Sequence, residues 1–273
     1  MTILDEIILY QRAEALPKQK ERISPSEMRA RALASPPPRD FTALLRREGE
    51  VAVIAEVKRA SPSKGLLCPD FDPLRLAEAY AQNGATGISV LTEARYFQGS
   101  LDYLAQIAHF RETNGIPFGI LRKDFVIDAY QVYEARAAGA DALLLIVAAL
   151  SDTALAELLA LTHALGMQVL LEAHDRAEIE RALACKPRLV GVNNRNLHDF
   201  SVNLDTCLAL RPAVPAEVFF VAESGIHTRA DVERVGAAGI DAVLVGESLV
   251  TAQDPGAQVR MLAGIRREQA GGS

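Results

Sequence analysis

The stretch Val51-Ala-Val-Ile-Ala-Glu-Val-Lys-Arg-Ala-Ser-Pro-Ser-Lys-Gly65 joins an apolar run to a charged turn. A short, continuously apolar run rich in β-branched residues predicts a strand buried on both faces, as in a parallel sheet. Two opposite charges, Glu56 and Lys58, lie at the carboxyl end of this strand, and Pro62 and Gly65 favour a turn after them. Buried ionisable groups are costly unless a substrate or partner uses them. The stretch therefore predicts a parallel α/β fold with a site for an anionic small molecule at the strand tip.

The same unit recurs along the chain. Apolar runs predict strands at 51–57, 86–91, 117–121, 142–147, 168–171, 189–193, 218–221 and 242–245. Helical patterns alternate with them, at 73–83, 101–112, 129–138, 152–165, 176–185, 204–210, 229–238 and 255–267. The chain also has a weak internal repeat, in which a Gly ends one helix just before the next strand. Its three copies are Asn83-Gly-Ala-Thr-Gly-Ile-Ser-Val90, Ala138-Gly-Ala-Asp-Ala-Leu-Leu-Leu145 and Ala238-Gly-Ile-Asp-Ala-Val-Leu-Val245.

Eight strand–helix units predict an α/β protein with a single (β/α)8 TIM barrel. A doubly wound sheet is the alternative, because its units look alike in sequence. We favour the barrel because the unit count reaches eight and no G-x-G-x-x-G follows the first strand.

Residues 1–50 precede the first predicted strand and are surplus to the barrel. Ile3, Leu4, Ile7 and Ile8 form an apolar stripe at helical spacing, and Ser24-Pro-Ser-Glu27 has the pattern of a capping box. Further on, three prolines at 36–38 break the chain before a short helix at about 41–47. We predict an N-terminal helical extension over 1–50, packed on the barrel, so that 1–273 form one domain.

Composition excludes several classes of protein. The chain carries a net charge of −6 and no block of more than two adjacent basic residues, which argues against nucleic-acid and membrane-surface binding. Asp5 and Glu6 interrupt the first apolar residues, unlike a signal peptide, and the longest apolar run, 142–150, is too short to span a bilayer. Three cysteines without C-x-x-C spacing predict reduced thiols: Cys68, Cys185 and Cys207. We expect a cytoplasmic monomer.

Polar residues follow most of the predicted strands. In a barrel these strand ends meet on one rim, so their convergence predicts a site there. The residues are Glu56, Lys58, Thr92, Glu93, Lys123, Asp124, Glu172, Asn193, Asn194, Arg195, Glu223, Ser224, Gly225, Gly246, Glu247 and Ser248. The small residues after the seventh and eighth strands, with a short helix starting near Glu247, have the composition of a phosphate cradle.

No metal or organic cofactor is predicted. The five histidines show neither H-x-H nor H-E-x-x-H spacing, and we expect them to lie on the surface or to cap helices: His109, His163, His174, His198 and His227.

Taken together, the motifs resemble the indole-3-glycerol-phosphate synthase family of tryptophan biosynthesis. They span nearly the whole chain in order: Ile54-Ala-Glu-Val-Lys-Arg-Ala-Ser-Pro-Ser63, Val90-Leu-Thr-Glu93, Leu121-Arg-Lys-Asp-Phe125, Leu171-Glu172, Gly191-Val-Asn-Asn-Arg-Asn-Leu197, Ala222-Glu-Ser-Gly-Ile226 and Val245-Gly-Glu-Ser-Leu249. Position 247 is Glu where some members have Ser, which matters little if the backbone holds phosphate there.

The resemblance implies a carboxy-lyase that closes the ring of 1-(2-carboxyphenylamino)-1-deoxy-D-ribulose 5-phosphate, then decarboxylates and dehydrates it to indole-3-glycerol phosphate without a cofactor. By this likeness Lys123 is the general acid, with Glu56 oriented toward it. Lys58 holds the anthranilate carboxylate and is a candidate to assist dehydration, and Glu172 is an acid or base of a later step. The residues that position hydroxyls and carboxylate are Asn193, Arg195 and Glu223. Those around the phosphate are Lys58, Ser61, Ser224, Gly225, Gly246 and Glu247.

Two other classes stay open at this point. A strand-end lysine facing a keto-sugar phosphate also suits a Schiff-base phosphosugar aldolase barrel. A non-catalytic phosphosugar-binding barrel is the third option, although burying lysines and glutamates at its mouth would then cost free energy without serving a reaction. Docking of the barrel to another enzyme of the pathway is also left open.

Overall fold

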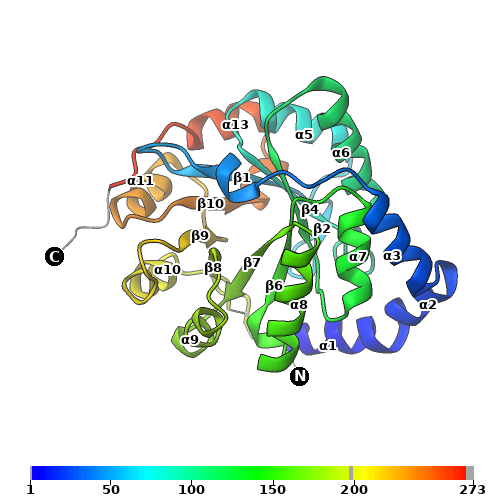
Figure 1. Cartoon of the computed structure of the whole chain (residues 1–273). Coiled ribbons are helices and arrows are strands. Elements are labelled where there is room, and N and C mark those ends of the chain that lie inside the picture. The colour runs from blue at the N-terminus through cyan, green and yellow to red at the C-terminus, as the bar shows by residue number, and fades with distance from the viewer. Residues whose placement is uncertain (1, 197–198, 269–273) are drawn as a thin grey trace.

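A closed barrel of parallel strands forms the centre of the molecule (Figure 1). A computed structural model describes residues 2–196 and 199–268 of the chain. Within them, eight strands pair in the order β1-β10-β9-β8-β7-β6-β5-β4, and β1 pairs with β4 to close the ring. The strands are β1 (Ala52–Val57), β4 (Gly87–Leu91), β5 (Gly119–Lys123), β6 (Ala142–Ile146), β7 (Gln168–Ala173), β8 (Leu189–Asn193), β9 (Phe219–Glu223) and β10 (Ala242–Val245). The predicted barrel is confirmed, and the doubly wound alternative is wrong.

Helices surround the barrel, one after nearly every strand. They are α5 (Pro73–Gln82), α6 (Leu101–Asn114), α7 (Ala129–Ala137), α8 (Asp152–Ala164), α9 (Arg176–Ala184), α10 (Asp205–Leu210), α11 (Arg229–Ala237), α12 (Glu247–Val250) and α13 (Pro255–Leu262), with one-turn 3₁₀ helices η2 (Val147–Ala149) and η3 (Arg211–Ala213). The last helix ends earlier than the predicted 267 because the chain turns back to pair with the segment before β1, where Val51 N donates to Ile265 O and Arg267 N to Gly49 O.

The N-terminal extension is helical, as predicted; its first helices lie along one side of the barrel, and the chain then crosses to a short helix beside β1 (Figure 1). It consists of α1 (Ile3–Tyr10), the π-helical turn η1 (Gln11–Ala15), α2 (Leu16–Arg22), α3 (Pro25–Ala34) and α4 (Phe41–Leu45). Ser24 caps α3 by accepting from Glu27 N, but the Glu27 carboxylate pairs with Arg31 instead of completing the capping box. Helix α3 packs on α7.

Two apolar layers hold the barrel together, because successive strand residues point to opposite faces. One layer joins the strands to the outer helices and includes Val53, Val90, Ile120 and Leu143. The other fills the interior with side chains two residues apart, including Ala52, Ile54, Leu121, Leu144, Leu170, Leu189, Val221 and Leu244. The extension closes the interior: Phe41 and Leu45 of α4 and Leu4 and Ile8 of α1 join this inner cluster.

None of the helices in the described part of the chain has the length and apolar character needed to cross a membrane.

Candidate active site

The inner apolar rows end in charged side chains at the carboxyl ends of the strands. Because residues two apart share a face, Ile54 is followed inside the barrel by Glu56, Leu121 by Lys123 and Leu170 by Glu172. These side chains reach a cavity of about 440 Å³ at this end of the barrel. The residues that the family resemblance implies for the site all line that cavity: Glu56, Lys58, Ser61, Lys123, Glu172, Asn193, Arg195, Glu223, Ser224, Gly225, Gly246 and Glu247.

Lys123 lies between two carboxylates. Its Nζ donates to Glu172 Oε2 at 2.7 Å and lies 3.3 Å from Glu223 Oε2, and only 14% of its side chain is exposed. Burial alone would lower the pKa of Lys123, but the Glu172, Glu223 and Glu56 carboxylates outweigh burial and hold it above its ordinary value. In the free protein Lys123 is therefore a charged ammonium with a proton to give.

Glu223 is the carboxyl of this cluster that is held neutral. Both of its carboxyl oxygens are buried and lack a hydrogen-bond partner within the described residues. Burial, together with the negative charge of Glu172, raises the pKa of Glu223 to about 8, although Lys123 acts in the opposite direction. The site thus combines an ionised carboxylate, Glu172, with an acid that is largely protonated at neutral pH.

Glu56 pairs with Lys58, as their spacing on one strand face predicts. Lys58 Nζ lies 2.8 Å from Glu56 Oε2, and both side chains are largely buried. The ion pair of Glu56 is thus with Lys58, whereas Glu172 is the carboxylate that contacts Lys123; the negative charge of Glu56 also acts on Lys123. The pairing is local, because Lys58 lies one residue beyond β1 and its flexible side chain reaches the carboxylate two positions before it.

Glu172 has a second group of partners on the side away from Lys123. Asn193 Nδ2 donates to Glu172 Oε1 at 3.3 Å, and His174 Nε2 lies 3.4 Å from the same oxygen. Burial would raise the pKa of Glu172, but Lys123 and His174 lower it below its ordinary value. The expectation of a surface or capping histidine is wrong for His174, which lies mostly buried against Glu172; the signal was its position two residues beyond Glu172 at a strand end. His198 lies outside the described residues.

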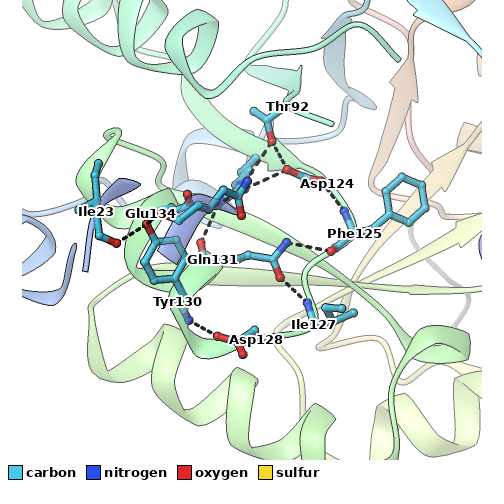
Figure 2. A network of polar contacts seen from close by, with 11 residues as sticks. Ile23, Thr92, Asp124, Phe125, Ile127, Asp128, Tyr130, Gln131 and Glu134 are labelled. Atoms are coloured by element: carbon cyan, nitrogen blue, oxygen red, sulfur yellow. Dashed lines mark hydrogen bonds and ion pairs between the residues drawn. The ribbon is translucent and has the colours of Figure 1, made fainter. Parts of the chain in front are cut away.

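Four other polar strand-end residues hold loops, and of these Asp124 also lines the cavity, whereas Thr92, Glu93 and Asn194 do not. The buried Glu93 carboxylate accepts from the backbone N–H groups of Arg95, Tyr96 and Phe97, so it stabilises the turn that follows it. The side chains of Thr92 and Asp124 bond to each other in a network beside the barrel (Figure 2). Asn194 Nδ2 donates to the Glu223 and Ser224 carbonyls, which joins β8 to the turn after β9.

Tight turns form one end of the cavity. Ser224 and Gly225 both have positive φ, 63° and 81°, so the chain after β9 turns sharply beside the mouth. Gly246 follows β10 so closely against β1 that a Cβ there would collide with the Glu56 carboxylate and reach 2.9 Å from Lys58 Nζ. The Glu247 carboxylate lies 3.7 Å from Arg195 and 3.9 Å from Lys64, and α12 starts at Glu247. Ser61 Oγ is buried and lacks a hydrogen-bond partner in the described residues.

Apolar and aromatic side chains form the rest of the cavity wall. The rings of Phe97 and Phe125 lie 5.9 Å apart, centroid to centroid, and helix α1 contributes from the extension. The residues are Ile3, Leu4, Ile7, Leu91, Phe97, Phe125 and Phe200. Sequence reasoning missed these residues, because single apolar side chains at loops and in an N-terminal helix carry no distinguishing pattern. Within the described residues no group of three or more His, Cys, Asp or Glu is arranged to hold a metal ion.

Solved structures support the barrel architecture. Tryptophan synthase subunit alpha from Legionella pneumophila str. Paris superposes with a TM-score of 0.62 at 15% identity, covering 82% of this chain and 96% of that one. The 3-hexulose-6-phosphate synthase from Salmonella typhimurium gives a TM-score of 0.60 at 13% identity, covering 78% of this chain and 96% of that one. At such identities the likeness concerns the fold alone.

Sequence relatives are much closer. The family model described as indole-3-glycerol phosphate synthase matches residues 4–262. A protein of that name from Roseiflexus sp. (strain RS-1) is 53% identical over 266 residues, covering 96% of this chain and 98% of the relative. Another of that name, from Polaromonas sp. (strain JS666 / ATCC BAA-500), is 49% identical over 269 residues, covering 96% of this chain and 98% of the relative. The chain belongs to the indole-3-glycerol phosphate synthase family.

Proposed function

We propose that this chain is a carboxy-lyase that converts 1-(2-carboxyphenylamino)-1-deoxy-D-ribulose 5-phosphate to indole-3-glycerol phosphate, CO₂ and water. The observation that carries the proposal is the cluster at Lys123. A charged ammonium lies between an ionised carboxylate, Glu172, and a largely neutral carboxyl, Glu223, and all three side chains are largely buried. Ring closure and dehydration need an acid and a base in the same place, and this cluster supplies both.

Lys123 is the general acid of ring closure. Its Nζ gives a proton to the ribulose carbonyl oxygen as the aromatic carbon attacks the carbonyl carbon. Lys123 is left as a neutral amine. Loss of CO₂ returns the bonding electrons to the ring. An acid then protonates the new hydroxyl, which leaves as water, and a base removes a proton from the neighbouring ring carbon, so that the new double bond completes the indole. Glu172 is an acid or base of these later steps, and Glu223, with Asn193 and Arg195, positions the substrate's hydroxyl and carboxylate groups.

The two ends of the cavity suit the two ends of this substrate. Lys58 holds the anthranilate carboxylate, and the aromatic wall near Phe97 and Phe125 packs against the anthranilate ring. Backbone N–H groups at the turns of Ser224-Gly225 and Gly246-Glu247, with Ser61 and Lys58, hold the phosphate. Lys58 thus lies between the two anions, and its bond to Glu56 orients it.

Membership of the synthase family does not favour a Schiff-base phosphosugar aldolase. Such an aldolase needs a neutral lysine nucleophile, whereas the carboxylates around Lys123 favour its charged form. A covalent adduct and a synthase product are readily distinguished in one experiment.

The test is incubation of the purified chain with the carboxyphenylamino-deoxyribulose phosphate while the fluorescence of the indole product is followed. We expect product without any adduct that borohydride can trap, because no covalent link forms. Absence of product, or a trapped adduct at Lys123, would reject the proposal. A matched control is His109→Gln, an exposed change on α6 that should leave the rate unchanged.

We further propose that the chain works as a cytoplasmic monomer, folded as one domain over 1–273. Cys68, Cys185 and Cys207 are free thiols, which fits a reducing compartment. Size-exclusion chromatography with light scattering should give the mass of one chain; a stable dimer would contradict this.

A further inference from the structure

His174 lines a second cavity and contacts Glu172, which lines the reaction cavity. Its Nε2 lies 3.4 Å from Glu172 Oε1, and its Nδ1 lies 3.0 Å from Glu178 Oε2 on α9. Glu178 Oε2 also accepts from the His174 backbone N–H at 2.8 Å, which fixes the position of that carboxylate. The imidazole is therefore placed between two carboxylates, one on β7 facing the reaction cavity and one on α9 facing away from it.

The second cavity has a volume of about 520 Å³ and is lined by His174, Asp175, Glu178, Asn193 and Arg195, among others. Asn193 and Arg195 line both cavities, so the two spaces are neighbours. The charged groups that face His174 or share its cavity are Glu172 on β7, Glu178 on α9, Asp5 on α1, Asp175 and Arg195.

The surroundings of the ring favour its charged form. Burial would lower the pKa of His174, but Glu172 and Glu178 outweigh burial and raise it to about 10. An imidazolium carries a proton on both nitrogens. Nδ1 lies within hydrogen-bond distance of Glu178 Oε2. Nε2 makes no hydrogen bond within the described residues, and its contact with Glu172 Oε1 at 3.4 Å is an ion pair. At neutral pH Glu172 thus has a cation on either side, Lys123 and His174.

These two cations have different fates in the proposed reaction. Lys123 becomes neutral when it gives its proton to the substrate, and a buried carboxylate that loses its cation tends to take up a proton itself. His174 is not consumed in that step, so its positive charge remains beside Glu172.

We propose that His174 is a positioning residue that keeps Glu172 ionised and correctly oriented while Lys123 is neutral. Glu172 then stays ionised and able to act as a base in the later steps. Lys123 regains its proton from solvent, and Glu172 does not take up that proton in its place. This inference rests on the proposed function of the site, and it concerns a residue that touches Glu172 and not the reacting atoms.

The kinetic test compares His174→Gln with the parent chain. Glutamine keeps a polar N–H group but removes the charge, so kcat should fall by roughly tenfold or more while KM changes less than about threefold. The acidic limb of the kcat–pH profile should move to higher pH by about one unit, because Glu172 now takes up a proton more readily. Glu178→Gln should cause a smaller shift in the same direction, and His109→Gln none. An unchanged kcat and pH profile in His174→Gln would overturn the proposal, as would a loss of rate with an unmoved acidic limb.

A second measurement needs no turnover and so separates this inference from the proposed function. Histidine ring resonances are titrated by NMR in the parent chain, with His174→Gln used to assign the signal. The His174 ring should stay protonated well above its ordinary pKa of 6.5. In Glu172→Gln its titration midpoint should fall by about one unit or more. A parent midpoint near 6.5, or one that Glu172→Gln leaves unmoved, would reject the role of His174 whatever reaction the site performs.

Discussion

At the scale of single residues, the site depends on direct contacts between oppositely charged side chains. Lys123 contacts Glu172 and Glu223, Glu56 contacts Lys58, and all of these side chains are largely buried. Buried ion pairs contribute little net stability, because desolvation offsets the attraction. Their value here is chemical, since low exposure keeps protons and charges where the reaction needs them.

Lys123→Ala should abolish turnover, with kcat lower by roughly 10³-fold or more, because the general acid acts mainly in the transition state. Substrate binding should be largely retained, as measured by calorimetry with the substrate, which this variant does not convert. A near-normal kcat in this variant would remove Lys123 from the mechanism.

Gly191 of β8 makes room for the Glu223 carboxyl. A Cβ at this position would collide with Glu223 Oε1 and lie 3.1 Å from Leu170 Cδ1. Gly191→Ala should therefore push Glu223 away from Lys123 and lower kcat by roughly 10- to 100-fold, with a smaller effect on stability. The measurement is kcat and KM beside a thermal melt. A variant with the parent's kcat would show that the exact position of Glu223 is unimportant.

At the scale of elements, a buried polar network joins β5 to α7 and to the N-terminal extension. Arg122 contacts Asp124 at 2.9 Å and Glu134 at 3.3 Å. Gln131 donates to Phe125 O and accepts from Ile127 N, which clamps the loop that carries Phe125 to the cavity (Figure 2). Tyr130 donates its hydroxyl to backbone carbonyls of the extension, including Ile23 O at 3.0 Å (Figure 2).

Arg122→Met should lower the free energy of unfolding by about 3–5 kcal/mol, because it leaves the Asp124 and Glu134 carboxylates buried without their cation. Denaturant unfolding measures this loss. The matched control is Arg29→Met on the exposed side of α3, which should change stability by less than about 0.5 kcal/mol. Equal effects of the two substitutions would contradict the role given to the network.

The turns after β9 and β10 should recognise phosphate on their own. Inorganic phosphate or sulfate is expected to raise the apparent KM for the substrate without changing kcat, because the anion occupies only the phosphate end of the cavity. Sodium chloride at equal ionic strength serves as the control. Inhibition that lowers kcat at saturating substrate would place the anion elsewhere.

At the scale of the whole molecule, the site imposes a pH dependence on stability. The ordinary pKa of a Glu carboxyl is 4.5, and burial raises that of Glu223 to about 8. Between these values the folded chain binds more protons than the unfolded chain, so the free energy of unfolding falls as the pH rises. The stabilisation from a protonated Glu223 is therefore complete below 4.5 and lost as the pH passes about 8.

Glu223→Gln should weaken this dependence, because the amide stays neutral at every pH. The Tm of the variant should rise relative to that of the parent chain between about pH 5 and about pH 9. Thermal melts at several pH values provide the measurement. Curves of Tm against pH that run parallel for the two proteins would show that Glu223 does not titrate as described.

The barrel and the charged residues at its mouth could be predicted from local patterns in the sequence. Strand and helix periodicity is local, so runs such as 51–57 and 242–245 could be recognised without the fold. The alternation of side chains then put Glu56 and Lys58 on one face, and the known meeting of strand ends in a barrel put Lys123 and Glu172 at the same rim.

Only the tertiary structure decided which of these residues pair. Glu56 pairs with Lys58, and His174 lies between Glu172 and Glu178. Asp124 lines the cavity while its carboxylate bonds to Arg122. The aromatic wall and the part that α1 plays in closing the cavity were equally unpredictable. The physical reason is that periodicity fixes the face of a strand on which a side chain lies, whereas pairing depends on distances between strands, helices and loops far apart in the sequence.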